Sequence, residues 1–212
     1  MDEITDFVIK YHTLRNPFKD IFKVDKNVQK AYDVMRVDMM LKYDISFGCY
    51  EKASGKLVGV FFASMHDKNQ NQANSSYSEF GKNKCALQAA LRFLQHLERD
   101  LFLSLSANRI MLATLGTVHP DYAGHEIAPA IINHLLKYAH KNRCDHAVGV
   151  GVSLPAQKVN EKIGFTFLKE VKYADYVDPV TGKKTDLDLS PIHTHARVYY
   201  YRVPPQINQS ML

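Results

Sequence analysis

The chain has 212 residues, of which 46% are hydrophobic and 23% charged, as expected for one globular domain with its own core. It contains no apolar run of about 18 residues, so we expect no membrane-spanning helix. The net charge of +5 arises from basic residues spread along the chain rather than clustered in an arm or patch, which argues against nucleic-acid binding.

The three cysteines (Cys49, Cys85 and Cys144) form no CxxC pair, which argues against a zinc site or a disulfide framework and favours a reducing compartment. The first residues, MDEITDF, are acidic and lack the basic-then-apolar order of a secretory signal. We therefore expect a cytoplasmic protein with a single domain over residues 1–212.

The amino-terminal part begins with residues 7–14 (FVIKYHTL), which predict a first strand. This strand ends at Asn16-Pro17, because the residue before a proline leaves the helical region and proline itself favours the first turn of a helix. Residues 27–41 follow with the apolar spacing of a helix. Residues 45–50 and 56–65 are β-rich runs on either side of an Ala-Ser-Gly turn, and they predict a hairpin.

Residues 66–83 are polar and of low complexity, as in a surface loop. Helical spacing resumes over residues 84–103. A strand at residues 111–118 then leads through a short loop into a helix at residues 126–141. A buried strand that turns directly into a helix is a device for holding an anion. The first-turn N–H groups lack partners within the helix, and the helix dipole adds positive charge there.

The carboxyl-terminal part contains a buried-type strand at residues 147–152, a short helix at 155–163 and a strand at 165–176. After a long polar excursion, residues 196–203 predict the last strand and residues 204–212 a frayed tail. The element order predicts one α/β domain on a mixed sheet of about seven strands flanked by helices. Parallel strands surround the central crossover, and antiparallel pairs lie at the ends.

Three landmarks in the second half resemble those of one enzyme superfamily. The stretch Val118–Ala128 (VHPDYAGHEIA) is similar to the acetyl-CoA signature of the GNAT superfamily, in which a V-x-P strand end precedes R/Q-x-x-G-x-G/A. Glu161–Phe165 (EKIGF) resembles the family's EKLGF, and residues 173–179 resemble the tail of insect-type arylalkylamine N-acetyltransferases. The landmarks occur in the family's order, so the resemblance implies a single-domain GNAT-like fold.

In that superfamily, backbone N–H groups of the loop hold the pyrophosphate of acetyl-CoA, and the pantetheine arm pairs with the splayed strand end. The resemblance therefore implies acetyl-CoA as co-substrate and no metal. The residues that it assigns to cofactor binding are Gly116, Thr117, Val118, Ala123, Gly124, His125, Glu126, Ile127, Ala128, Pro129 and Asn160.

Two of these residues depart from the signature, and a third has a plainer interpretation. Ala123 replaces the Arg or Gln, and Glu126 replaces the central glycine. A carboxylate is favoured at a helix N-terminus, so Glu126 could cap its own helix and compete with phosphates. A self-capped helix without ligand is therefore the alternative. Asn160 lies where many relatives hold the pantetheine arm; otherwise it faces solvent.

The implied reaction transfers an acetyl group from the thioester to a small primary amine, and the resemblance favours an arylalkylamine. The amine must lose a proton before it attacks, and the departing thiolate benefits from a proton donor. A covalent enzyme intermediate is unnecessary if amine and thioester are held together.

Three residues are candidates for these proton transfers. Asp20 belongs to a Phe-Lys-Asp run that precedes a glutamate in the insect-type enzymes, but Ile21 stands at that place; Asp20 is otherwise a surface acid. His119 lies at the strand end near the expected thioester, although loop histidines are usually unspecialised. Ser153 stands where the insect-type enzymes have a functional serine, or else it caps the next helix.

A second hypothesis is a catalytically weakened relative that binds acyl-CoA or a partner without turnover. It rests on the departures at Ile21, Ala156 and Glu126. His193 and His195 have the spacing of one strand face, but without a third ligand they predict no metal site. Several tyrosines could line an arylamine pocket or serve as ordinary strand residues. They are Tyr173, Tyr176, Tyr199, Tyr200 and Tyr201.

Overall fold

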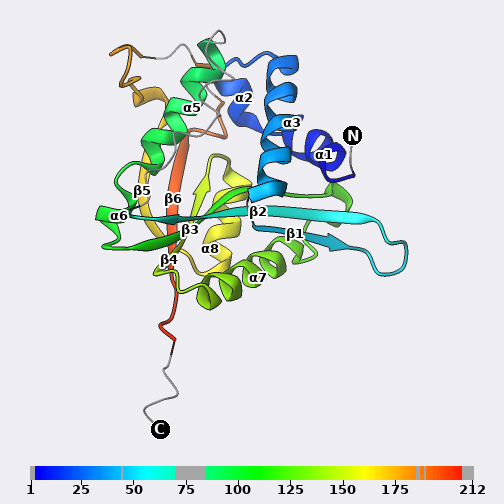
Figure 1. Ribbon diagram of the computed structural model, residues 1–212. Coiled ribbons are helices and arrows are strands. Elements are labelled where there is room, and N and C mark those ends of the chain that lie inside the picture. Colours follow the sequence, from blue (N-terminus) through cyan, green and yellow to red (C-terminus); the bar gives the residue numbers. More distant parts are fainter. Residues whose placement is uncertain (1–2, 44, 70–84, 185–186, 189, 207–212) are drawn as a thin grey trace.

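The computed structural model describes residues 3–43, 45–69, 85–184, 187–188 and 190–206. Its centre is a six-stranded sheet in the order β1-β2-β3-β4-β6-β5 (Figure 1). The strands are β1 (Ile45–Tyr50), β2 (Leu57–Asp67), β3 (Arg109–Val118), β4 (His146–Gly151), β5 (Thr166–Lys172) and β6 (His195–Arg202). β3 and β4 pair in parallel, and the other four pairs are antiparallel, as expected for a mixed sheet.

Helices cover both faces of this sheet (Figure 1). One face carries α1 (Glu3–Val8), the π-helix η1 (Ile9–Thr13), α2 (Pro17–Ile21), α3 (Lys26–Tyr43) and α5 (Cys85–Glu98). The other face carries α7 (Ile127–Lys141) and α8 (Leu154–Ile163). Three short elements complete the fold, namely α6 (Leu101–Ser104), η2 (Pro120–Tyr122) and η3 (Tyr173–Asp175). None of the helices in the described ranges is long and apolar enough to span a bilayer.

The two faces follow from the alternation of side chains along each strand. Leu112, Val148 and Val198 belong to the core cluster of α2 and α5, whereas their neighbours Met111 and Ala147 belong to the cluster of α7. The helices expected at residues 27–41, 84–103, 126–141 and 155–163 correspond to α3, α5, α7 and α8.

The strand expected at residues 7–14 is wrong, and its absence reduces the sheet from about seven strands to six. These residues form the end of α1 and the whole of η1. Phe7, Val8 and Ile9 are all buried, which a strand with one covered face would not achieve. A helix does so here because α1 packs against both α3 and β2.

The ends of β2 and β5 differ from expectation. β2 continues to Asp67, two residues into the predicted polar loop, because its last residues pair with the start of β3. The rest of that loop from residue 70 onward, and residues 207–212 of the predicted tail, lie outside the described residues. β5 ends at Lys172, where the chain turns into η3.

The parallel strands separate at their carboxyl ends. β3 pairs with β4 only as far as Ala113 opposite Gly149, although β3 continues along β2 to Val118 and β4 continues along β6 to Gly151. The separation begins beside a bulge at Thr114, an extra residue of β3 opposite β2. Because a bulge bends its strand, the end of β3 turns away from β4 and an opening forms between them.

Candidate functional site

The loop after β3 presents backbone N–H groups beside this opening. Gly124 has a φ of +82° and Glu126 a φ of 58°, both in the left-handed region. A left-handed residue followed by a helical one, here Glu126 and Ile127, turns successive N–H groups toward one side, an arrangement that binds anions. The dipole and unpaired first-turn donors of α7 act at the same place. We call Gly124–Ala128 the N–H cradle.

The backbone of Glu126 explains why a glycine suits this position. A non-glycine residue in the left-handed region costs roughly 1–2 kcal/mol. The carboxylate does not cap α7; it pairs with Lys162 of α8, and both side chains are more than half exposed. The structure therefore does not show the self-capped helix of the alternative interpretation. The pair directs the negative charge to α8 and away from a capping position.

His119 is a packed residue rather than an exposed loop histidine. It is 7% exposed, and its ring contacts Tyr11 at 4.5 Å and Tyr122 at 5.6 Å between centroids. Its Nδ1 accepts the N–H of Asp121 at 3.2 Å, so the neutral ring carries its proton on Nε2. His119 thus fixes the start of the loop and retains one donor nitrogen.

Ser153 is the N-cap residue of α8, yet its hydroxyl makes no capping bond. The N–H of Leu154 donates instead to Nδ1 of His193 at 3.2 Å, and Pro155 has no N–H to offer. The described residues provide no hydrogen-bond partner for this hydroxyl. The capping alternative is therefore not observed, and Ser153 lies just beyond β4 at the opening with its hydroxyl unengaged.

Asn160 is buried against β4 instead of facing solvent. It is 9% exposed, and its Nδ2 donates to the Ala156 carbonyl at 3.0 Å. A Cβ at Gly149 would lie 2.5 Å from Asn160 Oδ1, so the glycine makes room for this side chain. Gly149 belongs to the last β3–β4 pair. Asn160 thus lies on the α8 face where the opening begins.

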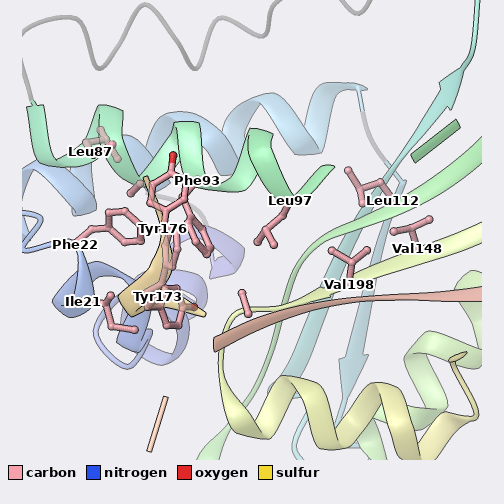
Figure 2. Packing of buried hydrophobic residues seen from close by; sticks show 14 of the residues in the cluster. Ile21, Phe22, Leu87, Phe93, Leu97, Leu112, Val148, Tyr173, Tyr176 and Val198 are labelled. Carbon is pink, nitrogen blue, oxygen red and sulfur yellow. The ribbon is translucent and has the colours of Figure 1, made fainter. Parts of the chain in front are cut away.

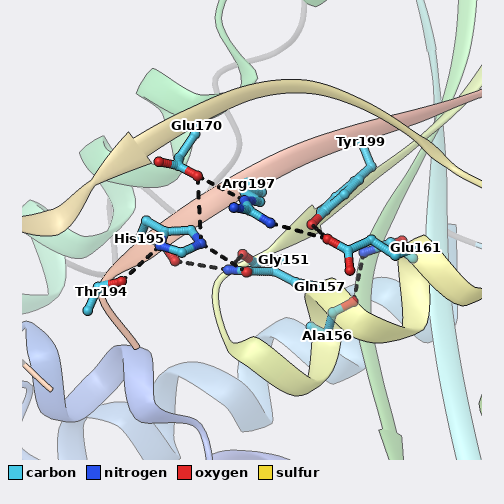
Figure 3. Close-up of polar contacts among 10 residues, drawn as sticks. Gly151, Ala156, Gln157, Glu161, Glu170, Thr194, His195, Arg197 and Tyr199 are labelled. Atoms are coloured by element: carbon cyan, nitrogen blue, oxygen red, sulfur yellow. Dashed lines mark hydrogen bonds and ion pairs between the residues drawn. The ribbon is translucent and has the colours of Figure 1, made fainter. Parts of the chain in front are cut away.

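Sequence reasoning missed a polar network that holds α8 against β6 (Figure 3). Gln157 Nε2 donates to the carbonyls of Gly151 at 3.1 Å and His195 at 3.0 Å, and its Oε1 lies 3.1 Å from Nε2 of His195. Arg197 donates to Glu170 at 2.9 Å, a bond that holds the pKa of Glu170 below its usual range. In the sequence, the alternation of polar residues along β6 was the feature that could have indicated this network.

On the opposite face, two helical elements bind the free end of β3. Arg36 of α3 donates through Nη2 to the Thr114 carbonyl at 2.6 Å, directly at the bulge. Thr117 donates through Oγ1 to the Tyr11 carbonyl of η1 at 3.0 Å. The segment assigned to the pantetheine arm therefore has η1 and α3 along one side.

Asp20 lies apart from the other two catalytic candidates. It is on α2, its side chain is 67% exposed, and it pairs with Lys19 at 2.7 Å. In the part of the chain that the structure describes, it makes no hydrogen bond to His119 or Ser153. Ile21 stands at the position that the resemblance assigns to a glutamate, and it is 1% exposed and packs in the core.

Two of the candidate tyrosines, Tyr173 and Tyr176, belong to the core on the α5 face (Figure 2), whereas Tyr199 is in the α7 cluster. Tyr173 is 0% and Tyr176 3% exposed, and both pack on Phe93 at centroid distances of 5.1 and 4.8 Å. Burial raises the pKa of Tyr176 to about 12. Tyr173 donates to the Val152 carbonyl at 2.8 Å, which ties this cluster to the end of β4. Tyr173 therefore supports the opening from within the core, whereas Tyr176 also borders a hollow beside β5.

Two open hollows of about 480 and 310 Å³ lie beside β5, and no residue of the N–H cradle lines either of them. The larger is lined in part by His96, Lys172 and Tyr176, and the smaller in part by Phe167 and Arg197. Within the described ranges, no group of three or more His, Cys, Asp or Glu residues is placed to hold a metal ion.

No protein-family model and no curated protein matches this chain in sequence. Solved structures do match its fold. A putative arylalkylamine N-acetyltransferase 7 from the mosquito Aedes aegypti has a TM-score of 0.80 at 15% identity, over 96% of this chain and 86% of that one. A polyamine N-acetyltransferase from Drosophila melanogaster, which forms N-acetylagmatine, has a TM-score of 0.76 at 12% identity, over 94% and 93%.

The C-terminal condensation domain of Ebony, solved with β-alanyl-dopamine, has a TM-score of 0.68 at 15% identity, over 95% of this chain and 93% of that one. The chain therefore has the fold of the insect-type N-acetyltransferases, and the expected GNAT-like fold is confirmed. At these identities the likeness concerns the fold.

Proposed function

We propose that this protein transfers an acetyl group from acetyl-CoA to a small primary amine. The observation that carries the proposal is the opening between β3 and β4, which ends at the N–H cradle. A thioester cofactor with an extended arm and a pyrophosphate requires both features: free strand edges for the arm and oriented N–H groups for the phosphates. The fold match to N-acetyltransferases supports the same assignment.

The residues present fit acetyl-CoA. The Glu126 carboxylate makes no capping bond to α7, and its pairing with Lys162 brings a cation close to the same loop. Of the cradle donors, the His125 N–H already donates to the Tyr122 carbonyl at 3.3 Å. Gly116, Thr117 and Val118 would hold the arm along β3, with Asn160 on the α8 side. The cofactor supplies an acyl carbon activated by a thiol leaving group.

The chain's own contribution is positioning and proton transfer. Direct attack by the amine requires that the two substrates be held together, which is a large part of such rate enhancements. We assign the proton donation to the departing thiolate to Ser153, whose hydroxyl makes no capping bond, and we assign to His119 the role of holding the loop through Asp121. Asp20 remains a weaker candidate because it is exposed and paired with Lys19.

We propose arylalkylamines as the first substrate class to test, with polyamines second. The proposal draws on the neighbours that are arylalkylamine and polyamine N-acetyltransferases. We further propose a cytoplasmic location, because Cys49, Cys85 and Cys144 are all free thiols.

Two measurements test the function. Calorimetric titration with acetyl-CoA should show saturable binding; an absence of heat at millimolar cofactor would overturn the proposal. Release of free thiol should then be measured with tryptamine, dopamine, agmatine and spermidine. Binding of acetyl-CoA without thiol release from any amine would favour the weakened, non-catalytic relative.

A further inference from the structure

A buried polar cluster joins η1 to α3 beside the end of β3. Asp33 is 1% exposed, and its Oδ2 accepts from Thr13 Oγ1 at 2.8 Å and Gln29 Nε2 at 2.9 Å. Its Oδ1 is buried and has no partner in the described part of the chain. Leaving a buried carboxylate oxygen unpaired costs free energy, so the site calls for an additional donor or positive charge.

His12 directly precedes Thr13, the residue that binds this carboxylate, and its pKa responds to the charge of Asp33. Burial lowers the pKa of His12, Asp33 raises it, and Arg36 lowers it. Asn16 caps α2 by accepting the Phe18 N–H on Oδ1 at 3.0 Å, so its amide nitrogen is the atom that lies 3.3 Å from Nε2 of His12. An amide nitrogen only donates, so Nε2 presents a lone pair and the ring proton lies on Nδ1.

The cluster adjoins the proposed acyl-transfer site. Arg36, one of the two charged groups that act on His12, also binds the Thr114 carbonyl at the bulge. Tyr11, next to His12 in η1, accepts from Thr117 and packs on the His119 ring. η1 is a π-helix, a rare form that occurs often at functional sites. The cluster lies on the face of the sheet opposite α7 and α8.

The position at which the insect-type resemblance implies a glutamate is Ile21, which is buried in the core. Asp20 is exposed and paired with Lys19. A base for the amine is therefore still required, and it must come from another element.

We propose that His12 is the general base for the amine and that Asp33 is its positioning residue; this inference rests on the proposed function. The ammonium group of the substrate replaces the Asn16 amide at Nε2 and transfers one proton to it. The imidazolium that forms is stabilised by the Asp33 carboxylate. The freed nitrogen lone pair forms the C–N bond as the C–S bond breaks. The second nitrogen proton passes to the thiolate, directly or through Ser153, and His12 releases its proton to solvent.

The test compares His12→Gln with His134→Gln, a control on the exposed surface of α7. We expect His12→Gln to lower kcat about 100-fold or more, while acetyl-CoA affinity changes less than about twofold. The acid limb of its pH–rate profile should disappear. Imidazole should restore part of the activity of His12→Ala. A kcat within about threefold of wild type, with an unchanged acid limb, would overturn the assignment.

Two further variants separate catalysis from folding. Asp33→Asn should move the acid limb to lower pH, because the carboxylate that favours the imidazolium is lost. Asn16→Ser keeps an N-cap oxygen for α2 but removes the amide that opposes protonation, so the limb should move to higher pH. Limbs that stay in place in both variants would reject His12 as the titrating group.

A readout without turnover distinguishes this inference from the proposed function. In the presence of CoA, addition of tryptamine or agmatine should shift the imidazole NMR resonances of His12 but leave those of His134 in place. Unshifted His12 resonances would overturn the inference even if the enzyme is active. A protein that binds no acetyl-CoA would instead overturn the proposed function.

Discussion

The imidazole Nδ1 of His193 accepts the N–H of Leu154 at 3.2 Å, and the hydroxyl of the preceding N-cap residue, Ser153, makes no bond to α8. A residue 39 positions away thus accepts the first N–H of α8, whereas an N-cap serine would accept the second or third. This arrangement leaves Ser153 available for chemistry, and it predicts that the two residues have separable roles.

Ser153→Ala should lower kcat about tenfold to 100-fold if the hydroxyl protonates the thiolate. Its free energy of unfolding should change by less than about 0.5 kcal/mol, because no cap is lost. His193→Ala should instead lower the free energy of unfolding by roughly 1 kcal/mol and change kcat less than Ser153→Ala does. Steady-state kinetics and urea denaturation measure both quantities. A loss of about 1 kcal/mol in Ser153→Ala would show that the hydroxyl caps α8 in solution.

Glu126→Gly should tighten acetyl-CoA binding because it removes a carboxylate from the loop, and it should also stabilise the fold by relieving left-handed strain of roughly 1–2 kcal/mol. Glu126→Ala is the matched control, since it removes the charge but keeps the strain. Lys162→Met should weaken binding by freeing the carboxylate to turn toward the loop. Calorimetry with acetyl-CoA measures each effect, and unchanged or weaker binding in both Glu126 variants would show that the carboxylate does not oppose the pyrophosphate.

Gly149→Ala should destabilise the protein by about 1–3 kcal/mol, because the new Cβ would meet Asn160 Oδ1 at 2.5 Å in a close-packed contact. Asn160→Ala in the same chain should recover most of that loss. The double-mutant cycle is read from thermal and urea unfolding. Additive effects would show that Asn160 does not occupy the space over Gly149.

Glu98 provides a prediction on pH. Burial raises its pKa from 4.5 to about 7, against the opposing charges of Arg36 and Lys169. The folded state therefore favours the protonated carboxyl. This contribution is complete below pH 4.5 and is lost as the pH rises through about 7.

Glu98→Gln imitates the protonated form at every pH. Near pH 8 it should exceed the wild type in free energy of unfolding by on the order of 2 kcal/mol, and near pH 4 the two should be similar. Urea denaturation across this range measures the difference. A constant difference at all pH values would show that Glu98 does not titrate with a raised pKa.

The sequence determined the local elements of this fold. Helical spacing located α3, α5, α7 and α8, and the β-rich runs around an Ala-Ser-Gly turn located the β1–β2 hairpin. The landmarks between residues 110 and 203 identified the fold because they consist of contiguous residues. Each of these features depends on residues that are close together in the chain, so the sequence shows it directly.

Tertiary packing decided the rest. Residues 7–14 became helix because α3 and β2 bury three consecutive side chains there. His193 reached Leu154, Thr13 reached Asp33, and Arg36 reached Thr114 across 39, 20 and 78 positions, distances at which no periodicity links residues. The site is assembled from such contacts at the divided end of the sheet, so its chemistry was set by which side chains the fold brought together.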